Sequence, residues 1–165
     1  MTFAGIDYSS VAIDVVRLEL DSDEARWDRI LLDPTGKLEA LERARRVREL
    51  MPARSAWADD GVVTIALEDP RGPTFKGSIP LARVQGAILA CLPGPGDVDV
   101  IALAPWEWKM ACGLSGNAKK VLIREWVLRL WSLTNLPDRY TQDALDAYAI
   151  AWAARSLCEK AAAAA

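Results

Sequence analysis

The first part of the chain carries short apolar runs separated by polar residues, a pattern typical of β-strands. Thr2–Tyr8 and Val11–Leu20, which alternates apolar and polar residues in its second half, are separated only by Ser9-Ser10 and predict a hairpin. Arg26–Leu32 follows the polar turn Asp21–Glu24 and predicts a third strand. We therefore expect the chain to begin with a β-meander.

The rest of the chain alternates helical periods with buried apolar runs. Val62–Leu67 and Val98–Leu103 are short and rich in β-branched residues, which predicts buried parallel strands. Helical periods bounded by turn signals predict helices at 38–50, 78–92 and 119–133, and a short turn or helix at 105–110. Thr141 is placed to cap a last helix that reaches about Glu159, and the alanine tail at 161–165 is expected to fray.

This order of elements predicts an α/β fold, namely a mixed five-stranded sheet with helices on both faces. Of the 165 residues, 52% are hydrophobic, which suffices for a sizeable core and excludes a disordered chain. The sequence shows no internal repeat, so residues 1–160 are expected to form one domain.

The N-terminus and the cysteines narrow the class of protein. The chain does not begin with a basic and then apolar leader, and no apolar run reaches the roughly 18 residues that span a membrane, so we expect a cytoplasmic protein without a membrane partner. Cys91, Cys112 and Cys158 are widely spaced and the chain has no histidine, which disfavours zinc sites and histidine-based triads. The cysteines are expected to be small apolar residues of the interior.

Four carboxylates stand where apolar sequence should exclude them. Asp7 ends the first strand and Glu68 ends the run VVTIALE, so the two can meet if these strands are neighbours. Asp143 and Asp146 open the stretch DALDAYAIAWAA and, at i and i+3, share one helix face. Burial of ionised carboxylates is costly unless a cation compensates them. The pattern predicts a site for Mg²⁺ or Mn²⁺, and two such ions can catalyse phosphodiester hydrolysis.

Each of these carboxylates also has a local explanation, as a helix cap, a turn residue or the start of a loop. If they do cluster, and no lysine enters the cluster, their mutual repulsion should raise their coupled pKa values. The net charge of −3 and a pI near 5.1 argue, taken alone, against a nucleic-acid partner. Phosphate affinity depends more on local groups of Lys and Arg than on the total charge, however.

Four short segments follow one another in an order that spans nearly the whole chain. They are GIDYSS, the strand that ends in Glu68, KMACGLSGNAKK and DALDA. Together they resemble the RuvC-type Holliday-junction resolvases of the RNase H-like superfamily, although Tyr8-Ser9-Ser10 replaces the usual glycine-containing turn. The resemblance implies an RNase H-like fold and a Mg²⁺-dependent endonuclease that resolves branched DNA in recombination and repair, in a bacterium or a phage-infected host. It also implies the following metal-binding residues: Asp7, Glu68, Asp143 and Asp146.

The resemblance further implies contacts with DNA. Lys109 and Lys120 match the two basic positions that flank the glycine-containing loop of the family, where they bind DNA and stabilise phosphate. Lys119 is an alternative to Lys120 because the loop is one residue longer than usual, and Lys109 is expected to act in catalysis as well. Arg124, at i+4 from Lys120, either extends this positive stripe or is a solvated surface residue.

The segment 71–78 follows Glu68 directly and carries Phe75 and Lys76. In the family the corresponding loop presents an aromatic wedge at the centre of the junction, so both residues are candidates for DNA binding. Alternatively, Phe75 packs under its own loop.

A four-way junction has approximate two-fold symmetry, and the resemblance implies a C2 homodimer. The helix after the Glu strand forms the interface in the family, and here that helix is 81–92, whose apolar residues could equally cover the sheet of one subunit. The same carboxylates would also serve a nuclease for RNA–DNA hybrids or other branched DNA. A non-catalytic junction-binding module is a further alternative.

Overall fold

Five strands form a single mixed sheet in the computed structural model, which describes residues 1–20, 25–33, 35–69, 75–94, 96, 98–130 and 140–164, without the side chains of 75–80. The strand order is β3-β2-β1-β4-β5. β1 pairs antiparallel with β2 and parallel with β4. β2 pairs antiparallel with β3, and β4 pairs parallel with β5. The strands are β1 (Thr2–Tyr8), β2 (Ala12–Glu19), β3 (Ala25–Leu31), β4 (Val62–Glu68) and β5 (Asp99–Leu103).

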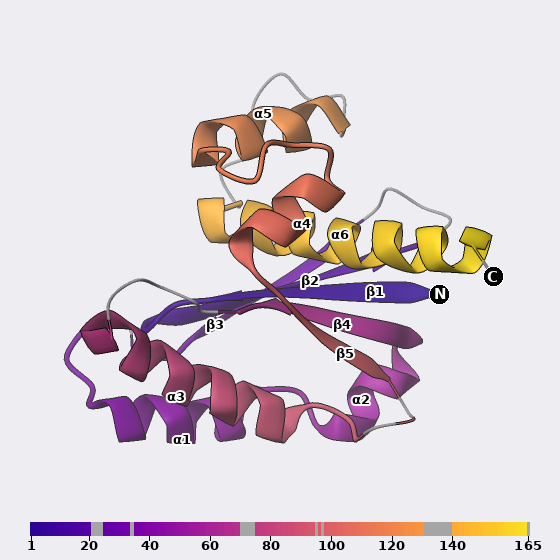
Figure 1. The fold of residues 1–165 in the computed structure, drawn as a ribbon. Coiled ribbons are helices and arrows are strands. Elements are labelled where there is room, and N and C mark those ends of the chain that lie inside the picture. Colours follow the sequence, from indigo (N-terminus) through magenta and orange to yellow (C-terminus); the bar gives the residue numbers. More distant parts are fainter. Residues whose placement is uncertain are drawn as a thin grey trace.

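Helices cover both faces of this sheet (Figure 1). One face carries α1 (Ala40–Leu50), α2 (Arg54–Asp59) and α3 (Phe75–Cys91). The opposite face carries α4 (Pro105–Ala111), α5 (Lys120–Leu130) and α6 (Gln142–Ala164). The predicted α/β class, with a mixed five-stranded sheet and helices on both faces, is therefore confirmed.

Three helices differ from the sequence-based expectation. α2 was not predicted, because six residues are too few to reveal a helical period. α3 begins at Phe75 rather than at 78, and the glycine and proline of its first turns lower helix propensity without preventing the helix. α6 continues to Ala164, beyond the end expected at about Glu159, and alanine is the strongest helix former.

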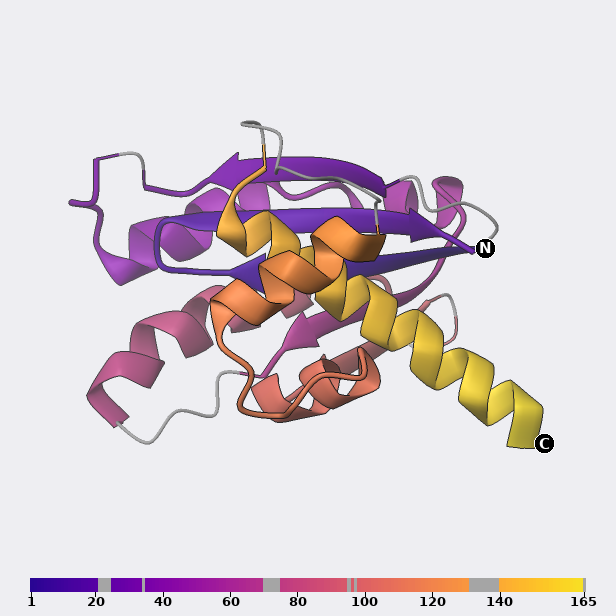
Figure 2. The same cartoon turned by 90° about the horizontal axis from the view of Figure 1, so that it is seen from above.

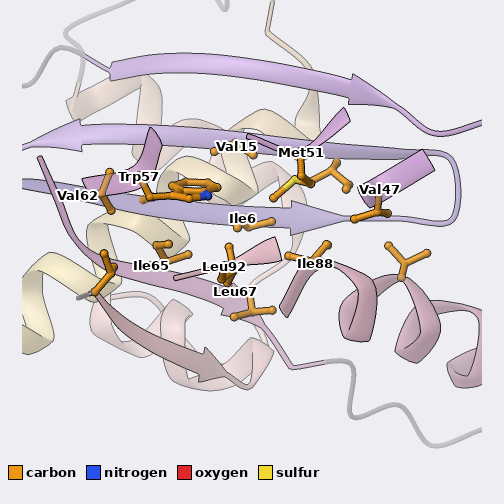
Figure 3. Close-up of a cluster of buried hydrophobic side chains, with 14 of the residues drawn as sticks. Ile6, Val15, Val47, Met51, Trp57, Val62, Ile65, Leu67, Ile88 and Leu92 are labelled. Atoms are coloured by element: carbon orange, nitrogen blue, oxygen red, sulfur yellow. The ribbon is translucent and has the colours of Figure 1, made fainter. Parts of the chain in front are cut away.

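The larger core cluster lies between the sheet and the α1, α2 and α3 layer (Figure 3). Even-numbered residues of β1 point to this side, and Ile6 packs there with Ile65 and Leu67 of β4. The helices contribute Val47 of α1 and Ile88 of α3, all of these side chains being fully buried. This packing holds β1 and β4 side by side, so that their carboxyl ends lie at the same edge of the sheet.

The opposite face of β1 is covered closely by α6, which crosses over the sheet (Figure 2). A Cβ atom at Gly5 would overlap the Ala147 carbonyl oxygen and the Ala151 amide nitrogen, so this contact requires glycine. Alanines on α6 give the helix the small surface that such an approach needs. As a result the first turns of α6 lie above the carboxyl end of β1, where Asp7 stands.

Candidate active site

The four carboxylates predicted from the sequence line one cavity of about 280 Å³. Ile6 of β1 lies opposite Leu67 of β4, so the residues that follow, Asp7 and Glu68, lie side by side at the ends of two parallel strands. Asp143 and Asp146 reach the cavity from the first turns of α6. The helix is capped at its start as expected, because the Ala144 amide donates to Thr141 Oγ1 at 3.2 Å.

Aromatic residues fix the position of Glu68. The indole Nε1 of Trp108, on α4, donates a hydrogen bond to Glu68 Oε2 at 2.9 Å. The Tyr8 hydroxyl donates to the backbone oxygen of Glu68 at 3.0 Å. Trp108 is fully buried, and a buried indole N–H requires an acceptor. Sequence reasoning missed Trp108, although its place in the short helix before the glycine loop is a usable signal.

Asp146 is held by two neighbours from different helices. Gln142, one turn earlier on α6, donates from Nε2 to Asp146 Oδ1 at 2.9 Å. Lys120 Nζ lies 3.5 Å from Asp146 Oδ2 and 3.8 Å from Asp143 Oδ1. The condition stated above, that no lysine enters the cluster, is therefore not met. Ile123 and Val127 turn one face of α5 toward the core, and Lys120 continues that face toward the first turn of α6.

Burial and repulsion dominate the electrostatics of the cavity. Burial, followed by the charges of Asp146, Glu68 and Asp143, raises the pKa of Asp7 to about 8. Burial also raises the pKa values of Glu68 and Asp146, against the hydrogen bonds that each accepts. The pKa of Lys120 is lowered by burial but raised overall by the surrounding carboxylates. The cavity thus concentrates negative charge and has two lysines, Lys109 and Lys120, at its wall.

Of the predicted basic residues, Lys109 and Lys120 line the cavity. Lys109 lies on α4 with Nζ 5.2 Å from the centre of the Trp108 ring. Lys119 is exposed outside the cavity lining, and its carbonyl accepts the Leu122 amide at the start of α5. The geometry therefore favours Lys120 over Lys119 as the second basic position. Arg124 is exposed one turn further along α5 and does not line the cavity.

Phe75 and Lys76 form the beginning of α3, after Glu68 and the segment 70–74. Their side chains lie outside the part of the chain that the structure describes. Their assignment as DNA-binding residues stays a prediction.

Asp14 and Arg29 lie beside the cavity, and sequence reasoning missed both. Asp14 is the partner of Asp7 across β1 and β2, and its side chain is almost fully buried. Arg29 of β3 donates from Nη1 to Asp14 Oδ1 at 3.3 Å. An aspartate within the apolar alternation of VAIDVV is the signal that could have indicated a paired charge.

The donor chemistry of the cavity suits a hard divalent cation, because its acidic side chains offer only oxygen ligands. At Asp7, burial and the neighbouring carboxylates outweigh the charge of Lys120, which is why its pKa is raised. As they are oriented, no three acidic or cysteine side chains in the described ranges stand close enough together to enclose one metal ion. Simultaneous ligation by three of them thus requires side-chain rotation.

A mixed five-stranded sheet of this order, with helices on both faces, has the RNase H-like fold that the sequence predicts. The Thermus thermophilus RuvC structure matches with a TM-score of 0.75 and 20% identity, over 98% of this chain and 97% of that chain. T. thermophilus RuvC in complex with Holliday junction substrate matches with a TM-score of 0.73 and 19% identity, over 97% and 96%. The resemblance predicted from sequence is confirmed for the fold.

No protein-family model and no curated protein matches the chain. Within the ranges that the structure describes, no helix is long and apolar enough to cross a membrane. The three cysteines are free. Cys112 lies in the interior as expected, with its thiol directed at the Ala149 carbonyl, whereas Cys91 and Cys158 are only partly buried.

Proposed function

We propose that the protein is a divalent-metal-dependent, structure-selective endonuclease that nicks four-way DNA junctions or related branched DNA during recombination and repair. The observation that carries this proposal is the arrangement of Asp7, Glu68, Asp143 and Asp146 around one cavity with Lys109 and Lys120 at its wall. The likeness in fold to RuvC, one structure of which holds a Holliday junction, favours a branched substrate. Residues 1–160 would form one nuclease domain. The protein would act in the cytoplasm of a bacterium or a phage-infected host, where its DNA substrate lies.

Two Mg²⁺ or Mn²⁺ ions, held by the four carboxylates, would supply water activation and stabilisation of the leaving oxygen. The chain itself orients the ligands. Trp108 fixes one oxygen of Glu68, and Gln142 fixes one oxygen of Asp146, whose other oxygen faces Lys120 Nζ at 3.5 Å. Such hydrogen bonds to metal-binding carboxylates are a common means of orienting them.

Lys109 and Lys120 would bind the phosphates on either side of the scissile bond. Both line the cavity from helices that flank the loop 112–119, where Gly113 adopts a φ of 75° and so allows the sharp turn after α4. Lys120 is paired with Asp143 and Asp146, and an arriving phosphate offers it a second anionic partner. Burial raises the pKa of Glu68, and the charges of Lys109 and Lys120 act against that rise. Lys109 is our candidate for stabilising charge in the transition state.

A homodimer would place two such sites on one junction. Val84 and Ile88 of α3, and Leu92 directly after it, are buried against the sheet of their own subunit. This face of the helix therefore covers the sheet, which is the alternative role given above for its apolar residues. The other face exposes Leu89 and neighbouring small residues. We propose this exposed face as the dimer contact, and light scattering should give the mass of two chains.

Comparative cleavage tests the substrate. A four-way junction, a replication-fork-like branch, a linear duplex and an RNA–DNA hybrid of the same sequence are incubated with the protein and Mg²⁺. The proposal predicts paired nicks in the junction at a rate at least tenfold above those of the duplex and the hybrid. Preferred cutting of the hybrid would support the alternative nuclease, and junction binding without any turnover would support the non-catalytic module.

A further inference from the structure

Arg29 of β3 joins two strands and a helix at the edge of the candidate active site. Its Nη1 donates to Asp14 Oδ1 of β2 at 3.3 Å and to Thr141 Oγ1 at 2.7 Å. Its Nη2 lies 3.8 Å from Asp143 Oδ2. The guanidinium therefore contacts the residue that caps α6 and a carboxylate in the first turn of that helix.

The strand register explains why Arg29 reaches this place. Asp7 of β1 is paired with Asp14 of β2, and Asp14 is paired with Arg29 of β3. Residues paired directly across neighbouring strands lie on the same face of a sheet. The three side chains thus form a row beneath the start of α6, with the carboxylate of Asp14 between the candidate ligand Asp7 and the guanidinium.

The side chain of Trp27, also on β3, likewise contacts both Asp14 and the residues at the start of α6. Trp27, two residues before Arg29 and on the same face, donates from Nε1 to Asp14 Oδ1 at 2.9 Å. Its ring centroid lies 5.7 Å from that of Tyr140, directly before the capping residue. Asp14 is almost fully buried, so both donors are held by an acceptor that cannot turn to water.

We infer that Arg29, anchored by Asp14, is a positioning residue that fixes the start of α6 and the carboxylate of Asp143 for the proposed nuclease reaction. The inference rests on the proposed function. Gly5 sets the height of the middle of α6 above the sheet, whereas Arg29 holds the end of the helix that carries two candidate ligands. Asp143 is the more exposed of these two ligands, with 35% of its side chain accessible against 10% for Asp146.

Arginine suits this role because its planar fork presents several N–H donors in fixed directions. One guanidinium can therefore contact Asp14, Thr141 and Asp143 together. A lysine would keep the charge beside Asp14 but could not span the same partners. The conservative variant Arg29→Lys thus separates the charge of this position from its geometry.

The test compares Arg29→Gln and Arg29→Lys with Arg26→Gln, a control on the same strand whose side chain is 77% exposed and pairs with Glu19. Single-turnover cleavage is measured at saturating junction, and junction affinity is measured in Ca²⁺. Hydrogen exchange is followed along α6. Loss of a partner that orients a ligand typically lowers activity about 10- to 100-fold. We expect that loss for Arg29→Gln, with affinity within about twofold of wild type and faster exchange only at the start of α6.

For Arg29→Lys we expect a folded protein with a smaller loss of rate and the same local increase in exchange. The control should match wild type in all readouts. Wild-type rate and exchange in Arg29→Lys and Arg29→Gln would overturn the inference, as would a loss of rate accompanied by faster exchange throughout the sheet. If the wild-type protein does not cut any junction, the proposed function fails, while the exchange data still decide whether Arg29 holds α6.

Discussion

Replacing Asp7 with Asn should stabilise the folded protein at neutral pH. The pKa of Asp7 is raised from 3.8 to about 8 by burial and by three neighbouring carboxylates. Between these values the folded chain keeps a proton that the unfolded chain releases, so the wild type loses stability as pH rises. The loss of stability between pH 3.8, the ordinary pKa, and pH 7 is at most about 4 kcal/mol, because one pKa unit corresponds to about 1.4 kcal/mol. Asp7 is only partly buried, so water screens some of this, and we expect a gain of about 1–3 kcal/mol.

Urea unfolding followed by tryptophan fluorescence at pH 4, 5, 6, 7 and 8 measures this gain. The free energies of unfolding of Asp7→Asn and wild type should be nearly equal at pH 4 and should diverge as pH rises towards 8, because the variant lacks the titrating group. Asp99→Asn, a change of the same kind at an exposed position of β5, should follow the wild type. A stability difference that is absent at pH 7, or that is constant over the whole pH range, would show that Asp7 does not keep its proton in the folded protein.

Three further changes test separate parts of the site. Lys120→Ala should weaken junction binding and reduce the slope of log affinity against log salt by about one, whereas the exposed Lys37→Ala should leave both unchanged; equal slopes for the two variants would remove Lys120 from the phosphate contacts. Trp108→Phe should lower the saturated cleavage rate about 10- to 100-fold through loss of the hydrogen bond to Glu68, and an unchanged single-turnover rate would contradict this. Gly5→Ala should destabilise the fold by about 1–3 kcal/mol or more in thermal or urea unfolding, because α6 has to move away from β1; wild-type stability would show that the contact can relax.

The sequence allowed the five strands and the four carboxylates of the cavity to be predicted, because each depends on a local signal. Apolar runs marked β1 and β4, and the acidic residues at their ends stood out against those runs. The i and i+3 spacing of Asp143 and Asp146 was enough to place both on one helix face. These features survive without knowledge of how the elements pack.

Features that depend on packing between distant elements were missed. The placement of Lys120 among the carboxylates follows from the face that α5 turns to α6, which a helical period alone does not set. The pairing of Asp14 with Arg29 depends on the register of β2 and β3, because a shift by one residue would direct either side chain to the other face. Trp108 reaches Glu68 only because α4 follows β5 directly beside β4.

Metal-dependent nicking of a synthetic four-way junction tests the central claim most directly. Wild type and Asp146→Asn are compared in Mg²⁺, in Ca²⁺ and in EDTA, with junction binding measured in parallel. We expect paired nicks by the wild type in Mg²⁺ but not in Ca²⁺ or EDTA, and no nicks by Asp146→Asn although it still folds and binds the junction. Cleavage by the wild type in EDTA, or cleavage by Asp146→Asn at the wild-type rate, would contradict it.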